Sequence, residues 1–415
     1  MKNQSLIILA FTAVAALSSC SKEIEEPDLT PKSLDLTAIA PEVISYCNDF
    51  GVELFTKVAL EENDNLMLSP LSASTALTML LNGCDGETYD QLKETLKYPE
   101  TMSISEINEV YKSLVSQLLV VDPKVKLALA NAIFYRQGFI VKPPFLDTMT
   151  ADFDAEIAGL DFSLPSALTT INKWASDNTN GKIPKVLDKI SADAVMFLMN
   201  ALYFKGDWSY QFDKDLTSNR PFYPEGSGPV NVSTMKGDIG SKAMGGSSSN
   251  YKAIEMPYGC TNFTMVVIVP DGTLSEFIQS FTAETWNTIT SVLDSRGEFE
   301  KTTVYMPKYK FSYEKQLNDQ LLGMGMLDAF DPGLADLSGI SDASIYVSFV
   351  KQNTFVEVDE EGTEAAAVTT IGIELTSAMP QPFEFVIDKP FVFAIRERTT
   401  NTLLFIGQVT NPLNQ

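Results

Sequence analysis

The segment 357–379 constrains the fold of this 415-residue chain most, because it joins a strand pattern to loop chemistry. Alternate residues form a face that changes from small to bulky apolar side chains, which is typical of a half-buried strand. The members of this face are Thr363, Ala365, Ala367, Thr369, Ile371 and Ile373. The alanines bury too little surface to hold a strand alone, and the flanking residues 359–362 and 379–382 have turn composition.

Proline is absent from residues 363–379 and first occurs at Pro380. Proline removes a backbone donor and is poorly tolerated in a central strand. The segment therefore has a sequence that can enter the middle of a sheet, and this property ends at Pro380. These features predict a loop that can insert as a strand.

Several motifs agree with this prediction and carry a resemblance to a known family. EEGTEAAA at 360–367 and DKPFVFAIRERTTNTLLFIGQV at 388–409 resemble the reactive-centre loop and closing strands of serpins. Further similar stretches lie at 65–83, 171–183, 200–208 and 306–326. The similarity extends from about residue 40 to Pro412, in family order. The resemblance implies an α+β fold, with one domain of three β-sheets and about nine helices, and an exposed reactive-centre loop.

The resemblance implies suicide inhibition of a serine endopeptidase rather than enzyme activity. The uncut loop is held at both ends, so it cannot fill a gap in the main sheet until one peptide bond is cut. The protease is then trapped as a covalent acyl-enzyme while the loop inserts, and the inhibitor is consumed once. Loop insertion of this kind is a known example of strand addition and strain release.

The resemblance also assigns the parts of the loop. The hinge comprises Glu361, Gly362, Thr363, Glu364, Ala365, Ala366 and Ala367. The usual family interval of 14 residues from Gly362 places the scissile bond between Thr376 and Ser377. Because the stretch after this bond is about three residues longer than usual in the family, cleavage after Leu375 or after Ile373 stays an alternative.

The charge of the loop narrows the target class. No residue from Gln352 to Asp388 has a positive side chain, so the loop offers no Arg or Lys to the specificity pocket of a trypsin-like enzyme. Elastase-like, subtilisin-like or chymotrypsin-like enzymes fit Thr376, Leu375 and Ile373 better. A papain-like protease with Leu375 in its apolar subsite is a further option.

Five residues match the family's positions that control opening of the main sheet. They are Ser69, Ser72, Asn200, Gln352 and Trp208. Gln352 stands where many animal serpins have a histidine, and its amide donates and accepts without titrating. We therefore expect no histidine-like pH trigger.

The absence of histidine excludes other chemistry. Ser-His-Asp and Cys-His hydrolases lose their base, and His-ligated metal sites lose their ligands. We expect no cofactor and no metal. The formal net charge of −24 disfavours nucleic acid as a partner, and we expect a monomer.

The amino terminus has the pattern of an export signal. Lys2 precedes the apolar run 6–17, which is too short to span a bilayer, and the run ends in LSSC at Cys20. This resembles a bacterial lipobox with lipidation of Cys20, whereas an ordinary secretory signal is the alternative. The acidic residues that follow resemble a signal for export to the bacterial cell surface. We expect a signal peptide at 1–19, a flexible tether at 20–38, a serpin domain at 39–415, and an outer-membrane lipoprotein at the cell surface.

Local patterns predict the main elements. Residues 41–61 have helical spacing, Ser69 starts a helix that reaches about Leu81, and Ser103 with Glu106 forms a capping box. Strands are expected at 264–269, 346–358, 391–397 and 403–409, so helices would come early and strands late. Cys47 lies on an apolar helical face and is expected to be buried.

A non-inhibitory binding or carrier protein on the same scaffold is the alternative function. The small side chains of Thr363 and of residues 365–367 favour inhibition, because a charged or bulky inward hinge would block insertion.

Overall fold

Nine α-helices occur in the part of the chain that the structure describes. The computed structural model describes residues 30–245, 250–363 and 384–414. The helices are α1 (Ala40–Glu61), α2 (Pro70–Leu81), α3 (Gly86–Thr95), α4 (Ile104–Leu118), α5 (Pro143–Phe153), α6 (Pro165–Asn178), α7 (Leu274–Ser280), α8 (Ala283–Ser295) and α9 (Asn318–Leu322). None of these described helices is both long and apolar enough to cross a membrane.

The helix starts confirm the predictions made from capping residues. The Ser69 hydroxyl accepts a hydrogen bond of 3.2 Å from the Ser72 amide at the start of α2. At the start of α4, the Glu106 amide donates to Ser103 Oγ at 3.3 Å, and the Ser103 amide donates to Glu106 Oε2 at 2.8 Å. Each bond satisfies an amide that has no partner within the helix.

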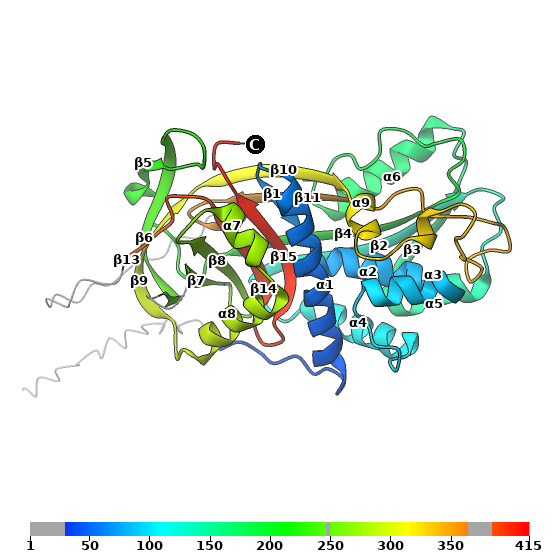
Figure 1. Ribbon diagram of the computed structural model, residues 1–415, viewed down its shortest axis with the longest axis horizontal. Helices are drawn as coiled ribbons and strands as arrows, with labels where there is room; N and C mark the ends of the chain where they lie inside the picture. The colour runs from blue at the N-terminus through cyan, green and yellow to red at the C-terminus, as the bar shows by residue number, and fades with distance from the viewer. Residues whose placement is uncertain (1–29, 246–249, 364–383, 415) are drawn as a thin grey trace, which may run out of the picture.

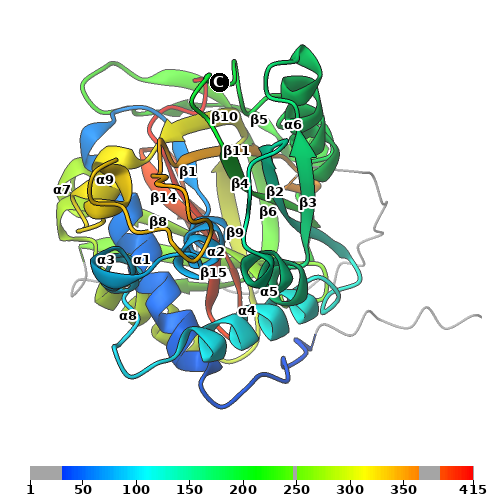
Figure 2. The same ribbon diagram turned by 90° about the vertical axis from the view of Figure 1, so that its right-hand side faces the viewer.

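A six-stranded sheet forms one layer of the domain, and Figure 2 shows several of its strands side by side. The order is β10 (Tyr309–Gln316), β11 (Lys351–Val358), β12 (Gly362–Thr363), β4 (Met196–Asp207), β2 (Val125–Arg136) and β3 (Ala155–Leu160). Neighbours are antiparallel except β2 and β3. Helix α6 contacts β2 and β4.

A nine-stranded sheet forms the second layer, at the left in Figure 1. Its order is β1 (Leu66–Leu68), β15 (Thr402–Val409), β14 (Phe391–Glu397), β8 (Phe263–Pro270), β7 (Tyr251–Tyr258), β6 (Val230–Met244), β9 (Glu300–Pro307) and β13 (Glu384–Val386), with β5 (Ser218–Phe222) on β6. Strand β6 pairs with β9 through residues 234–241 and with β7 through residues 242–244. This change of partner divides the layer in two, so the α+β fold with three sheets is confirmed.

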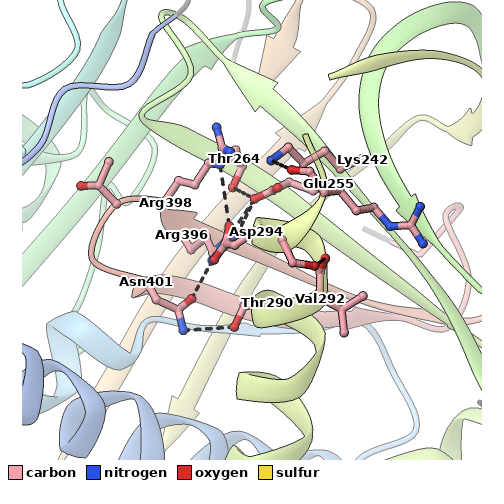
Figure 3. A network of polar contacts seen from close by, with 12 residues as sticks. Lys242, Glu255, Thr264, Thr290, Val292, Asp294, Arg396, Arg398 and Asn401 are labelled. Carbon is pink, nitrogen blue, oxygen red and sulfur yellow. Dashed lines mark hydrogen bonds and ion pairs between the residues drawn. The ribbon is translucent and has the colours of Figure 1, made fainter. Parts of the chain in front are cut away.

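A buried charge network joins α8 to the nine-stranded layer (Figure 3). The Arg396 guanidinium is fully buried, and its Nη2 lies 2.6 Å from Glu255 Oε1 and 2.6 Å from Asp294 Oδ1. Arg396 Nη1 also donates to Asn401 Oδ1 at 3.0 Å. Burying a charge is costly unless it is paired, and here two carboxylates and an amide surround one guanidinium.

The expected order of helices followed by strands is wrong. Strands β2, β3 and β4 come before Asp207, and helices α7 and α8 come after them. The strand expected at 346–358 begins only at Lys351, because residues 346–350 have no strand partner. Strand β4 was missed since its apolar residues do not alternate, and periodicity cannot separate such a run from a buried helix.

Residues 30–38 are held against the body, although the sequence assigns them to a flexible tether. The side chains of Gln117 and Asn262 bond to their backbone. The tether was inferred from the scarcity of apolar side chains, but these bonds need only the backbone of the segment. The burial expected of Cys47 is confirmed, and the three cysteines in the described residues are free.

Candidate functional site

The first hinge residues form a two-residue strand, β12, between β11 and β4. Gly362 lies opposite Asp207, and Thr363 lies opposite both Gly206 on β4 and Val358 on β11. A Cβ atom on Gly362 would lie 2.2 Å from the carbonyl oxygen of Gly206. Only glycine allows this close approach of the two backbones.

Beyond Thr363 the edges of β4 and β11 that face each other pair with no described strand. We call the region between residues 196–205 of β4 and residues 351–357 of β11 the slot. A cavity lies in it directly beside Thr363. Its walls include Leu202 and Phe204 of β4 and Phe355 and Val356 of β11. The slot can therefore take apolar side chains of a strand that continues from β12.

An acidic turn precedes β12, as predicted for residues 359–362. The Asp359 carboxylate accepts hydrogen bonds from the amides of Glu361 at 2.9 Å and Gly362 at 3.3 Å. Burial raises the pKa of Asp359, and these two amides act in the opposite direction. The Asp359 amide in turn donates to the Gly362 carbonyl at 3.0 Å, which closes the turn.

Trp208 holds this turn from the end of β4. Its amide donates to the Glu361 carbonyl at 2.8 Å, and its Nε1 donates to the Asp359 carbonyl at 3.0 Å. Its ring stacks on Tyr258 with centroids 4.3 Å apart and an angle of 11° between planes. The Tyr258 hydroxyl lies 2.6 Å from Thr363 Oγ1, and burial raises the pKa of Tyr258 well above its usual value. The phenol is therefore neutral and bonds the inward hydroxyl of the hinge.

Glu360 anchors the turn to neighbouring strands. Its carboxylate pairs with Lys308 Nζ at 2.6 Å and accepts from Thr217 Oγ1 at 2.8 Å. Burial tends to raise the pKa of Glu360, but bonds from Lys308 and Thr217 outweigh it and lower the pKa. Lys308, Thr217 and Tyr258 are not predicted from the sequence, because the first two lie 52 and 143 residues from Glu360 and the third lies 105 residues from Thr363. Lys308 falls within the similar stretch 306–326, but that stretch does not indicate its partner.

A second cluster surrounds Gln352, near the end of the β11 edge of the slot that lies farthest from β12. The Ser69 amide donates to Gln352 Oε1 at 2.8 Å, and Gln352 Nε2 donates to the Ser69 carbonyl at 2.9 Å. The Ser69 hydroxyl donates to the Leu404 carbonyl at 2.8 Å. Ser72 belongs to the cluster because its backbone amide donates a hydrogen bond to Ser69 Oγ. The structure thus brings Ser69, Ser72 and Gln352 together.

Asn200 lies on the opposite edge of the slot and makes a different contact. Its Nδ2 donates to Asn131 Oδ1 at 2.6 Å, whereas its own Oδ1 is buried and has no hydrogen-bond partner among the described residues. A buried polar atom without a partner costs free energy. Asn200 therefore offers an acceptor to a group that enters the slot.

Comparison with known proteins decides the family. The family model for serpins, described as serine protease inhibitors, matches residues 45–412. This chain is a serpin. A leukocyte elastase inhibitor of Xenopus laevis is 34% identical, over 89% of this chain and 99% of that protein. An uncharacterized serpin-like protein of Methanosarcina acetivorans is 32% identical, over 98% of both chains. The crystal structure of tengpin, a thermophilic serpin in the native state, matches with a TM-score of 0.81 and 30% identity over 92% of this chain and 97% of that one.

Some predicted site residues of this serpin lie outside the described residues. They are the hinge residues Glu364, Ala365, Ala366 and Ala367, the candidate cleavage-site residues Ile373, Leu375, Thr376 and Ser377, and the lipidation site Cys20. The described part contains Glu361, Gly362 and Thr363 at the start of the hinge.

Proposed function

We propose that this serpin is a suicide inhibitor of serine endopeptidases that traps the acyl-enzyme by loop insertion. The supporting observation is the position of β12, which already pairs with both edges at one end of the slot. Most members of the family are protease inhibitors rather than enzymes, and a leukocyte elastase inhibitor is among the relatives of this chain.

The register of β12 supports a specific path for the loop. Thr363 lies opposite Gly206 and Val358, and each further residue of an antiparallel strand moves one residue back along both neighbours. If the register continues, Thr369 lies opposite both Asn200 and Gln352. Thr369 belongs to the inward face with Thr363, so its hydroxyl can donate to the unpartnered Asn200 Oδ1. Insertion would then satisfy a buried acceptor.

The free energy of insertion is sufficient for a trap. The protease serine attacks the carbonyl carbon of Thr376, the amine of Ser377 leaves, and the released loop carries the ester-linked enzyme with it. Each added backbone hydrogen bond contributes about 1 kcal/mol net. Roughly a dozen residues, with Ile371 and Ile373 buried, would contribute on the order of 10 kcal/mol.

Elastase-like and subtilisin-like enzymes are the proposed targets, with cleavage after Thr376 and with Leu375 and Ile373 as alternative positions. A papain-like enzyme is a further candidate. We also propose that Cys20 carries a lipid that anchors the chain to the outer membrane, with the domain at the cell surface.

Incubation with elastase-like, subtilisin-like and trypsin-like enzymes tests the inhibitor. We expect a band of the combined mass on a denaturing gel with the first two classes, and mass spectrometry should find a new amino terminus at Ser377. Trypsin-like enzymes should form no such band. Cleavage of the loop without any covalent complex would favour the carrier function instead.

A further inference from the structure

Residues 30–39 form a strap on the surface of the body, and its first clamp is Asn262. The Lys32 amide donates to Asn262 Oδ1 at 2.9 Å, and Asn262 Nδ2 donates to the Lys32 carbonyl at 2.8 Å. Asn262 is fully buried and also donates to Glu397 Oε1 at 3.1 Å. One rigid amide therefore satisfies both backbone groups of Lys32, as a neighbouring strand would.

The second clamp is Gln117, near the end of α4. The Asp35 amide donates to Gln117 Oε1 at 2.7 Å, and Gln117 Nε2 donates to the Asp35 carbonyl at 2.6 Å. Between and beside the clamps, Leu34 and Leu36 pack against the main core. Two bidentate clamps and two apolar contacts fix the course of the strap.

The first clamp lies beside the hinge end of β4. Asn262 belongs to the turn between β7 and β8, and in the same turn the Gly259 amide donates to the Asp207 carbonyl at 2.9 Å. Tyr258, directly before this turn, bonds Thr363. In Figure 1 the dark blue strap runs from the lower end of α1 toward the side where β7 and β8 lie. The chain therefore reaches residue 30 near the hinge, away from the far ends of β2 and β3.

We propose that the strap orients the anchored serpin, so that its hinge end faces the phospholipid bilayer. The inference rests on the lipid anchor at Cys20 proposed above. Residues 20–29 span at most about 35 Å when fully extended. A compact chain of this length is roughly 55 Å across. With the strap docked, the opposite end of the body therefore cannot turn toward the bilayer.

Release of the strap would remove this restriction. All residues from Cys20 to Ile39 would then be free, and they span up to about 70 Å. The body could turn either end toward the bilayer. Orientation thus depends on the Asn262 and Gln117 clamps rather than on the length of the tether alone.

Energy transfer to the membrane tests the orientation. The mature lipidated chain is placed in phosphatidylcholine vesicles with an acceptor dye on the headgroups, and a donor dye is attached to Asn219→Cys or Ile140→Cys. Asn219 is exposed two residues after Thr217, which bonds Glu360 at the hinge. Ile140 is 79% exposed and follows the far end of β2. Both variants carry Cys84→Ser and Cys260→Ser, and Cys47 is buried.

We expect transfer efficiency at Asn219→Cys at least twice that at Ile140→Cys. Equal transfer, or stronger transfer at Ile140→Cys, would overturn the proposal. Chain that stays in the aqueous phase would overturn the anchor at Cys20, and with it the orientation. Vesicle-bound chain with equal transfer would overturn the orientation alone.

Two variants separate the strap from other causes. Insertion of ten Gly and Ser residues after Glu26 leaves both clamps intact and should remove most of the contrast between the two donor positions. Gln117→Ala with Asn262→Ala should remove it through strap release, and faster deuterium exchange of the Lys32 and Asp35 amides would report that release. If the double variant fails to fold, the insertion variant still tests the proposal. An unchanged difference in transfer efficiency between the two donor positions would show that the length of residues 20–29 does not restrict the orientation.

Discussion

The two sheet layers of this serpin differ in how completely their strands are paired and buried. Strands β8, β14 and β15 are buried along their whole length, and each pairs with neighbours on both sides. In the six-stranded sheet, burial alternates along β11, and the described residues of β4 and β11 meet only through the two residues of β12. The nine-stranded layer is complete at these strands, whereas the six-stranded sheet can still gain backbone bonds between β4 and β11. The nine-stranded layer thus contributes a fully paired, buried core, and the six-stranded sheet is the one that can accept another strand.

Cleavage of the loop should have the largest effect, because insertion would complete the six-stranded sheet. Insertion should stabilise the domain by on the order of 10 kcal/mol, which corresponds to a rise in Tm of roughly 10–15 °C for a domain of this length. Thermal unfolding of intact and loop-cleaved protein checks this. An unchanged Tm after cleavage at residues 373–377 would contradict the difference between the layers.

Arg396→Ala should have the next largest effect, because it disrupts the complete layer. Removing the guanidinium leaves the buried Glu255 without its cation and leaves Asp294 only its longer contact of 3.8 Å with Arg398, and we expect a loss of about 3–5 kcal/mol in the free energy of unfolding. Denaturant titration measures it. The matched control is Arg398→Ala, whose side chain is partly exposed and which should cost about 1 kcal/mol or less. Similar losses for both arginines would refute a special role for the buried network.

Thr363→Arg should act at the hinge end of the slot, where Thr363 is buried and bonds Tyr258 of β7. An arginine at this buried position places an unpaired charge in the cavity before as well as after cleavage, so we expect β12 to leave the slot. Covalent complex should then fall about a hundredfold relative to cleavage, which corresponds to about 2.8 kcal/mol. Gel quantification measures this ratio. Thr363→Val is the control, because it keeps the shape and removes only the hydroxyl, and it should still form complex. Complex formation by Thr363→Arg at the level of the parent would disprove insertion through this hinge.

Gln352→Ala should lower the free energy of unfolding by about 2 kcal/mol, because the Ser69 amide and carbonyl lose their hydrogen-bond partners in a buried site beside β11. Chemical unfolding checks the value. The exposed Gln316→Ala on β10 is the control and should change stability by less than about 0.5 kcal/mol. Equal effects of the two substitutions would show that the Ser69 contact contributes nothing specific.

Protonation of Glu360, in the turn before β12, should have the smallest effect on the free energy of unfolding. The pKa of Glu360 is lowered in the fold, so its stabilising contribution is present above the ordinary pKa of glutamate, 4.5, and is lost as the pH falls through the lower folded value. Glu360→Gln should therefore reduce the loss of stability on acidification below about pH 4.5. Unfolding of both proteins between pH 3 and pH 7 measures this. Identical pH profiles would rule out Glu360 as a contributor.

Local features were predictable because their partners lie close in the chain. Ser69 and the pair Ser103 and Glu106 cap helices through bonds that span three residues, and the run of aromatic and β-branched residues at 391–397 marks a strand. The missed strand β4 has apolar residues on both faces, so its period gives no signal. Resemblance to the family supplied Gln352 and Trp208. Lys308 lies within the similar stretch 306–326, but that stretch does not indicate its pairing with Glu360, and Tyr258 lies outside the similar stretches.

The sequence by itself determined the properties that belong to single segments: a hinge of small residues, a loop without proline before Pro380 and without positive charge, and a chain without histidine. Tertiary structure alone decided which distant groups meet, including Lys308 with Glu360 and Asn262 with Lys32. The physical reason is separation along the chain. Hydrogen bonds and ion pairs depend on the positions of two groups in space. For Lys308 and Glu360, 52 residues apart, the pairing of β10 with β11 sets those positions, and for Asn262 and Lys32, 230 residues apart, the docking of the strap sets them.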